Sequence, residues 1–206
     1  SSAIELAEAG LNVIVLEKDY FSFSNKYILL MVLVYTHKIT SRLTYVFKHI
    51  FENMLGVSVG FTKTIETFVA HSGPKFSYTK KQLGDEYFIP AHTLLYEQGV
   101  KLQTLDVERL DGFPIFFKTQ GDSFFSFDIF AATFFLLSRY EEVLPHIKTP
   151  QGFFDPAQSI AGQYDFLILP VVDLWVDHLQ KNLTVAFPGF FNTNDEKKKI
   201  NQKCAY

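Results

Sequence analysis

The sequence has only one cysteine, Cys204, and no two of its six histidines are spaced four residues apart. A single thiol excludes an internal disulfide framework and a cysteine-based zinc cluster. The histidine spacing excludes the helical motif that places two imidazoles on one face for a metal. The sequence also has no glycine-rich phosphate loop and no Gly-x-Ser-x-Gly elbow. The residues alone therefore indicate no catalytic constellation.

A strong charge of one sign is missing as well, because 19 Lys and Arg residues face 22 Asp and Glu residues. This balance predicts neither nucleic acid nor an anionic membrane as a partner. The apolar run Tyr27–Tyr35 is far shorter than the roughly 20 residues that span a bilayer. No small-residue cleavage site follows it, so we interpret the run as a buried central strand.

The sequence is rich in apolar residues, which make up 48% of the chain, and in aromatic residues, among them 23 phenylalanines. Dispersed phenylalanine is usually core material, so a packed core is expected. Predicted strands and helices alternate from Met31 to about Phe187, which favours an α/β fold with a mainly parallel or mixed sheet flanked by helices. The predicted strands are Tyr27–Tyr35, Val57–Thr62, Phe76–Thr79, Glu86–Ile89 and Phe113–Lys118, and the predicted helices are Thr40–Leu55, Ile65–Ala70, Phe127–Leu144 and Val171–Leu183. An extended segment, Leu167–Val172, is expected to lead into the last helix.

Four residues are candidates for ligand binding or for structural contacts. His37 follows the predicted central strand, and the carboxyl ends of strands are where open α/β sheets contact ligands; a loop or capping histidine is the alternative. Arg139 and Glu142 follow the apolar part of a helix, where an ion pair is favoured over a ligand contact. Asp173 shares a predicted helix face with Asp177 and lies near His178, so the two carboxylates and the imidazole could bind a metal or do acid–base work, or could simply face solvent.

The first nineteen residues contain a helix-forming segment, Gly10, the β-branched run Asn12–Leu16 and then Glu17. This order resembles the second part of a dinucleotide-binding unit of flavoprotein oxidoreductases. The resemblance implies that Glu17 would bind a ribose hydroxyl, but only together with a first strand and a glycine-rich loop that this sequence lacks. A plain helix–strand pair is the alternative interpretation.

Three stretches, Val34–Phe51, Phe127–Glu142 and Leu169–Trp175, resemble in this order the uncharacterised N-terminal domain of bacterial polysaccharide-deacetylase-like proteins. The resemblance implies an α/β accessory domain over residues 31–190. Residues 1–30 are then expected to be an appended fragment, and residues 191–206 a polar tail.

In the resembled family a metal-dependent carbohydrate deacetylase domain, a hydrolase, follows this one. An aspartate pair and a His-x-x-x-His motif hold its divalent metal, and neither is found after Phe190. We therefore assign no catalytic residue and no cofactor to this chain, and expect the metal only in the absent domain.

The resemblance implies a non-catalytic domain that positions a glycan or docks on the deacetylase domain in cis, in the cytoplasm. A truncated FAD- or NAD-binding oxidoreductase and a protein interaction module are the alternative functions.

Overall fold

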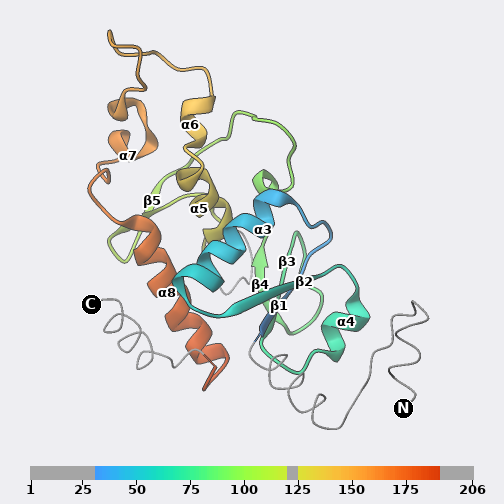
Figure 1. The fold of residues 1–206 in the computed structure, drawn as a ribbon. Coiled ribbons are helices and arrows are strands. Elements are labelled where there is room, and N and C mark those ends of the chain that lie inside the picture. The colour runs from blue at the N-terminus through green and yellow to red at the C-terminus, as the bar shows by residue number, and fades with distance from the viewer. Residues whose placement is uncertain (1–30, 120–124, 191–206) are drawn as a thin grey trace, which may run out of the picture.

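The computed structural model describes residues 31–119 and 125–190 (Figure 1). The predicted helix–strand pair with Glu17, the thiol of Cys204 and the predicted polar tail lie outside the described residues.

Four parallel strands form the central sheet, in the order β2-β1-β3-β4. Strand β1 is in the interior of the sheet, and its residues Val32, Leu33 and Val34 are buried. A strand covered on both faces has no polar face, which explains its unbroken apolar run. The structure thereby confirms the predicted α/β fold. The strands are β1 (Met31–Tyr35), β2 (Ser58–Thr62), β3 (Lys75–Thr79) and β4 (Tyr87–Pro90).

Helices cover both faces of this sheet. Val34 and its register partner Phe76 face the aromatic cluster around helix α3 (Ser41–Lys48), where the rings of Phe47 and Phe76 lie 6.1 Å apart. Side chains alternate along a strand, so Tyr35 points to the opposite face. There its ring contacts Phe68 of helix α4 (Ile65–Ala70) at 5.6 Å.

The order of the strands creates a topological switch point between β1 and β3. The chain leaves β1 through α3 to reach β2 on one side, and then crosses through α4 to β3 on the other side (Figure 1). The connections that leave the carboxyl ends of β1 and β3 therefore diverge. Open α/β sheets bind their ligands at this kind of crevice.

The connection from β3 to β4 is unusual, because it joins parallel neighbours through residues 80–86 alone. Such crossovers usually need a dozen or more residues. The Glu86 carboxylate organises this short one by accepting hydrogen bonds from Ser77 Oγ (2.5 Å), Leu83 N (2.8 Å) and Gly84 N (2.7 Å). Partial burial alone would raise the pKa of Glu86, but these hydrogen bonds lower it overall.

The core is built from phenylalanine, as the composition predicted. Phe47 and Phe130 stack with their ring centroids 3.7 Å apart, and both rings are fully buried. Helix α5 (Ile129–Leu137) brings Phe130 into the cluster, while α8 (Val171–Ala186) contributes Trp175. The Trp175 indole donates to Pro114 O (2.9 Å), which ties α8 to the small antiparallel sheet of β5 (Glu108–Leu110) and β6 (Phe113–Ile115).

The predicted single helix Phe127–Leu144 is wrong, because the chain breaks it at Arg139. Arg139 has a left-handed backbone (φ 52°) between α5 and the short helix α6 (Tyr140–Val143). The break turns Tyr140 inward, where its hydroxyl accepts from Lys101 N (2.8 Å) and donates to Lys101 O (3.0 Å). A tertiary contact thus overrides the helical preference of a continuous apolar stretch.

Three other boundaries also differ from the sequence predictions. The helix predicted over Thr40–Leu55 continues after Lys48 as a π-helix, η1 (His49–Met54). The strand predicted over Phe113–Lys118 stops at Ile115, since Phe117 has a positive φ of 57°. The expected extended segment before α8 is a turn, in which Leu169 N donates to Phe166 O. The remaining short helices are η2 (Thr93–Leu95), η3 (Pro156–Gln158) and α7 (Ile160–Gln163). Among the described helices, none combines the length and the apolar character needed to cross a membrane.

Candidate functional site

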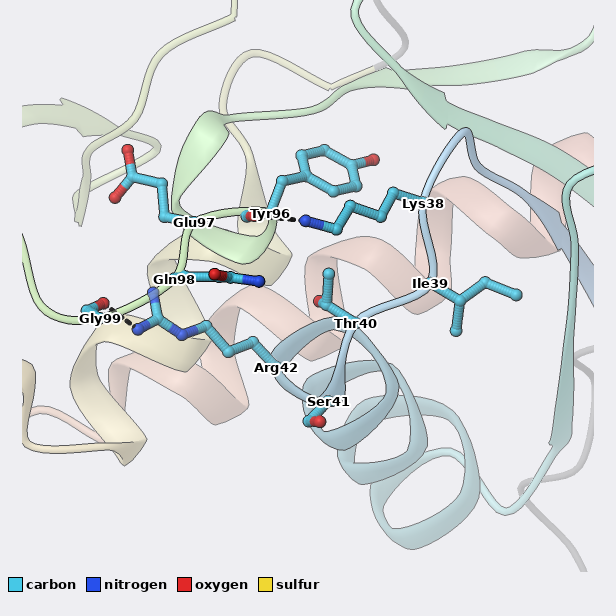
Figure 2. A pocket seen from close by; sticks show the side chains of 9 residues that line it. All are labelled: Lys38, Ile39, Thr40, Ser41, Arg42, Tyr96, Glu97, Gln98 and Gly99. Carbon is cyan, nitrogen blue, oxygen red and sulfur yellow. Dashed lines mark hydrogen bonds between the residues drawn. The ribbon is translucent and has the colours of Figure 1, made fainter.

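A cleft of about 430 Å³ opens at the carboxyl edge of the parallel sheet, beside the switch point. One wall is the loop after β1 with the start of α3, residues 38–42. The other wall is residues 96–99, which follow η2 (Figure 2). Two segments nearly 60 residues apart in the sequence therefore form the cleft together.

Tyr96 closes the switch point itself. Its hydroxyl donates to Tyr78 O at the end of β3 (2.8 Å) and lies 2.8 Å from Thr36 Oγ1, which follows β1. Since the phenolic proton is already used, the Thr36 hydroxyl is the donor in the second contact. Burial raises the pKa of Tyr96, so the phenol stays protonated. The chain itself thus fills the crevice between β1 and β3, and the open cleft lies next to it.

His37 lies at this edge, as its position after β1 predicted. Its side chain is exposed, and its ring centroid is 4.3 Å from that of Tyr96 with a tilt of 39°. The two rings form an aromatic pair beside the cleft. A ligand-binding role for His37 stays a prediction.

Side chains of the first wall hold the main chain of the second. Thr40 Oγ1 donates to Leu95 O (2.5 Å), and the Arg42 guanidinium donates to Leu94 O (3.0 Å) and to Gly99 O. Thr40 also caps α3 by accepting from Leu43 N (3.1 Å). The two walls are therefore fixed relative to each other before any ligand arrives.

Other polar groups of the cleft remain available for a ligand. Neither the Ser41 hydroxyl nor the Gln98 amide has a hydrogen-bond partner among residues 31–119 and 125–190. The Lys38 ammonium makes a single long contact, 3.4 Å, to Tyr96 O. Figure 2 shows the Gln98 side chain pointing between the walls toward Thr40. The cleft thus offers a hydroxyl, an amide, an ammonium group and the edge of an aromatic pair.

Asp128, a residue behind the cleft, is the buried polar centre that the sequence did not reveal. Oδ2 accepts from Tyr78 Oη (2.6 Å) and His92 N (2.7 Å), and Oδ1 accepts from Phe130 N (3.1 Å) and Ala131 N (3.0 Å). Burial raises its pKa to about 6, although all four hydrogen bonds lower it. Asp128 therefore caps α5 and at the same time links it to β3 and to the segment after β4. An aspartate before an apolar run indicates a cap, but not this burial.

Arg139 and Glu142 do not line the cleft. Arg139 Nε lies 2.5 Å from Glu142 Oε1 in an i, i+3 pair around the helix break, and the arginine side chain is 74% exposed. The sequence favoured a structural ion pair between Arg139 and a carboxylate across the sheet, whereas the pair that forms is local.

Asp173 and Asp177 are exposed on α8, while the neighbouring His178 packs its ring against Phe113 (5.7 Å) and Phe125 (5.3 Å). An imidazole used for aromatic packing is poorly placed for a metal. Over the described ranges, no group of three His, Cys, Asp or Glu residues is arranged to hold a metal ion.

The fold and the cleft define an open, mainly parallel α/β domain with a polar site at the carboxyl edge of its sheet. The chain belongs to the DUF7033 family, a family of unknown function, which matches residues 32–188. The match covers about three quarters of the chain and includes both walls of the cleft. Comparison with curated proteins and with solved structures finds no match in either set.

Proposed function

We propose that this chain is the accessory domain of a polysaccharide-deacetylase-like protein and that it binds a saccharide in the carboxyl-edge cleft. The observation that carries the proposal is the cleft itself, with its fixed walls and its unused polar groups. The resemblance of Val34–Phe51, Phe127–Glu142 and Leu169–Trp175 to that family supports the class of ligand.

The chemistry of the cleft suits a sugar. A volume of about 430 Å³ lies within the range of roughly 300–1,000 Å³ that is typical of small-molecule sites. Sugar hydroxyls both donate and accept hydrogen bonds. The Ser41 hydroxyl and the Gln98 amide can likewise donate to a sugar hydroxyl and accept from one. The exposed ring of His37, which packs against the half-buried ring of Tyr96, offers an apolar edge for the C–H face of a sugar ring.

In this proposal the deacetylation chemistry belongs to a separate domain. There a divalent metal would activate water against an N-acetyl group. The residues of this chain would bind and orient the glycan, and they would not take part in the bond-breaking step.

The test is to titrate the full chain with a neutral trisaccharide, triacetylchitotriose, and separately with an acidic one, trigalacturonate. Binding is monitored through the chemical shifts of the backbone amides. At least one of the two should move the amides of residues 38–42 and 96–99. The double variant Ser41→Ala/Gln98→Ala should weaken that binding about tenfold, because each lost hydrogen bond costs about 0.5–1.5 kcal/mol.

The matched control is Asp173→Ala, an exposed change outside the cleft, which should bind as the unmodified chain does. Shifts confined to other surfaces, or binding that survives the double variant unchanged, would contradict the proposal.

A second candidate function is docking on the catalytic domain. It is favoured by the hairpin of residues 147–154, which exposes two apolar side chains. Ile147 and Phe153 are 78% and 71% exposed. The hairpin is held rigid, since Thr149 N donates to Phe153 O (2.9 Å) and Gln158 Nε2 donates to Ile147 O (2.8 Å). The catalytic domain of the same protein, added in trans, should slow amide exchange over residues 147–153. Protection only at other sites would argue against this docking mode.

A further inference from the structure

Basic side chains follow three consecutive strands of the parallel sheet at its carboxyl edge. The chain as a whole is slightly acidic, with a formal net charge of −3 at pH 7. A group of basic residues at one edge therefore differs from the average charge of the chain. The residues are His37 and Lys38 after β1, Lys63 after β2, and Lys80 and Lys81 after β3, and all five are exposed.

The strand register brings these residues to one edge. Tyr35 of β1 pairs with Thr62 of β2, so Lys63 follows directly beside the end of β1. Tyr35 also pairs with Ser77 of β3, and β3 therefore runs two residues further along this edge before Lys80. Neighbouring strands are about 4.8 Å apart, so Lys38, Lys80 and Lys81 follow the two strands of the switch point that Tyr96 closes, and Lys63 follows the next strand.

None of these five side chains forms an ion pair within the part of the chain that the structure describes. The ion pairs found there, Lys118–Glu108 and Arg139–Glu142, involve none of the five residues. Lys38 has only its 3.4 Å contact to a carbonyl. By contrast, the guanidinium of the nearby Arg42 already donates hydrogen bonds to two main-chain carbonyls.

Four carboxylates lie near these lysines and form no ion pair with them. Asp85 and Glu86 belong to the same short connection as Lys80 and Lys81, where the Glu86 carboxylate accepts from Ser77, Leu83 and Gly84. Glu66 is exposed in the first turn of α4. Glu97 lines the cleft, but its carboxylate accepts from Thr93 Oγ1 (3.2 Å) and Gln103 Nε2 (3.1 Å), and Figure 2 shows it pointing away from Lys38. The first turn of α3 contains no acidic residue, so the partial positive charge of the helix N-terminus adds to that of the lysines.

We propose that the saccharide bound at this edge is anionic, a sugar chain carrying carboxylate or phosphate groups. The inference rests on the proposed saccharide binding and adds the class of substrate. The uncharged groups of Ser41 and Gln98 contact sugar hydroxyls in the cleft, and Lys38, Lys63, Lys80 and Lys81 attract the acidic groups of adjoining residues. Exposed unpaired ammonium groups around a polar cleft raise the local concentration of such a ligand.

The experiment compares three probes on the full chain by calorimetry: trigalacturonate, triacetylchitotriose and inorganic phosphate. The variant Lys80→Gln/Lys81→Gln removes two charges from the edge. The matched control Lys148→Gln/Lys181→Gln removes two exposed charges from the hairpin and from α8, and it alters the net charge by the same amount.

Trigalacturonate should bind more tightly than triacetylchitotriose. The Lys80/Lys81 variant should lose about tenfold in affinity for it at low salt, because two exposed charge contacts are removed, while the control variant should not change. Raising the salt to about 1 M, where the screening length is about 3 Å, should remove most of the difference.

Equal binding of the two trisaccharides, unaffected by the Lys80/Lys81 change, overturns the anionic assignment and leaves the proposed saccharide binding intact. Binding of phosphate without either sugar overturns the saccharide function, while lysine dependence of that binding would retain an anion site. No binding of any probe overturns both proposals.

Discussion

The substitution Asp128→Asn tests whether burial or hydrogen bonding dominates at the polar centre behind the cleft. Burial raises the pKa of Asp128 from 3.8 to about 6 in the folded chain. Between these two pH values the folded state binds more protons than the unfolded state, so the free energy of unfolding falls as the pH rises from about 4 to about 6. A shift of roughly two pKa units corresponds to about 3 kcal/mol.

The asparagine variant lacks this titration but introduces a different cost. If its oxygen keeps the two hydrogen bonds from α5, its NH₂ group replaces Oδ2 and faces the donors Tyr78 Oη and His92 N. The tyrosine hydroxyl can rotate to accept, but the His92 N–H loses its acceptor. An unpaired buried donor costs about 1–3 kcal/mol. The variant should therefore have a lower free energy of unfolding than the unmodified chain at pH 4. This difference should shrink by about 3 kcal/mol between pH 4 and pH 7, because only the unmodified chain loses stability as Asp128 ionises.

The assay is urea unfolding at several pH values between 4 and 7, followed by the fluorescence of Trp175, the single and fully buried tryptophan. The exposed change Asp173→Asn serves as the control and should track the unmodified chain at every pH. If the difference in free energy of unfolding between the unmodified chain and the variant widens as the pH rises from 4 to 6, the reasoning is refuted. It would mean that the four hydrogen bonds hold the pKa of Asp128 below its ordinary value.

Four further substitutions and one control substitution have defined outcomes. Lys75→Met removes three hydrogen bonds, 2.8–3.0 Å long, from Nζ to two carbonyls of α4 and to His71 O just after it, and should lower the free energy of unfolding by about 1–3 kcal/mol in a urea titration. Gly162→Ala forces a methyl group against the main-chain carbonyl oxygen of Pro156 and should lower the free energy of unfolding by about 1–3 kcal/mol. By contrast, Gly84→Ala, whose methyl group would lie 3.6 Å from the nearest atom, should be near neutral by the same titration. Tyr96→Phe removes the hydroxyl that joins β1 to β3 and should speed amide exchange in residues 93–99; unchanged exchange would show that Tyr96 does not hold the second wall of the cleft. Glu86→Gln should lower stability at pH 7, and the difference should shrink as acid protonates the native carboxylate through its lowered pKa; a difference independent of pH would contradict the role assigned to that charge.

The local elements of the fold could be predicted well from the sequence. The helix Ile65–Ala70 has the predicted bounds, and the strands β2, β3 and β4 each start within a residue of prediction. Short-range signals, such as apolar periodicity, β-branched runs and terminating glycine or proline, carry this information. The same signals failed at Arg139, because the helix break there allows Tyr140 to contact Lys101, which is far away in the sequence.

Little of the candidate site was predictable, because the predicted residue at this edge, His37, lies beside the cleft and does not line it. The position of His37 after a buried strand was enough to place it at the carboxyl edge. The opposite wall of the cleft was not foreseen, since Tyr96 and Gln98 lie in a polar loop with no motif. What assigns them to the site is the hydrogen bonding of Thr40 and Arg42 to that loop.

The sequence by itself determined the α/β class, the phenylalanine core and most of the elements, because hydrophobic periodicity and turn residues act over a few positions. Only the tertiary structure decided the strand order, the closure of the switch point by Tyr96, the burial of Asp128 and the gathering of lysines at one edge. Each of these depends on pairings between residues tens of positions apart. Strand register and the packing of both sheet faces select such pairings, and no local pattern encodes them.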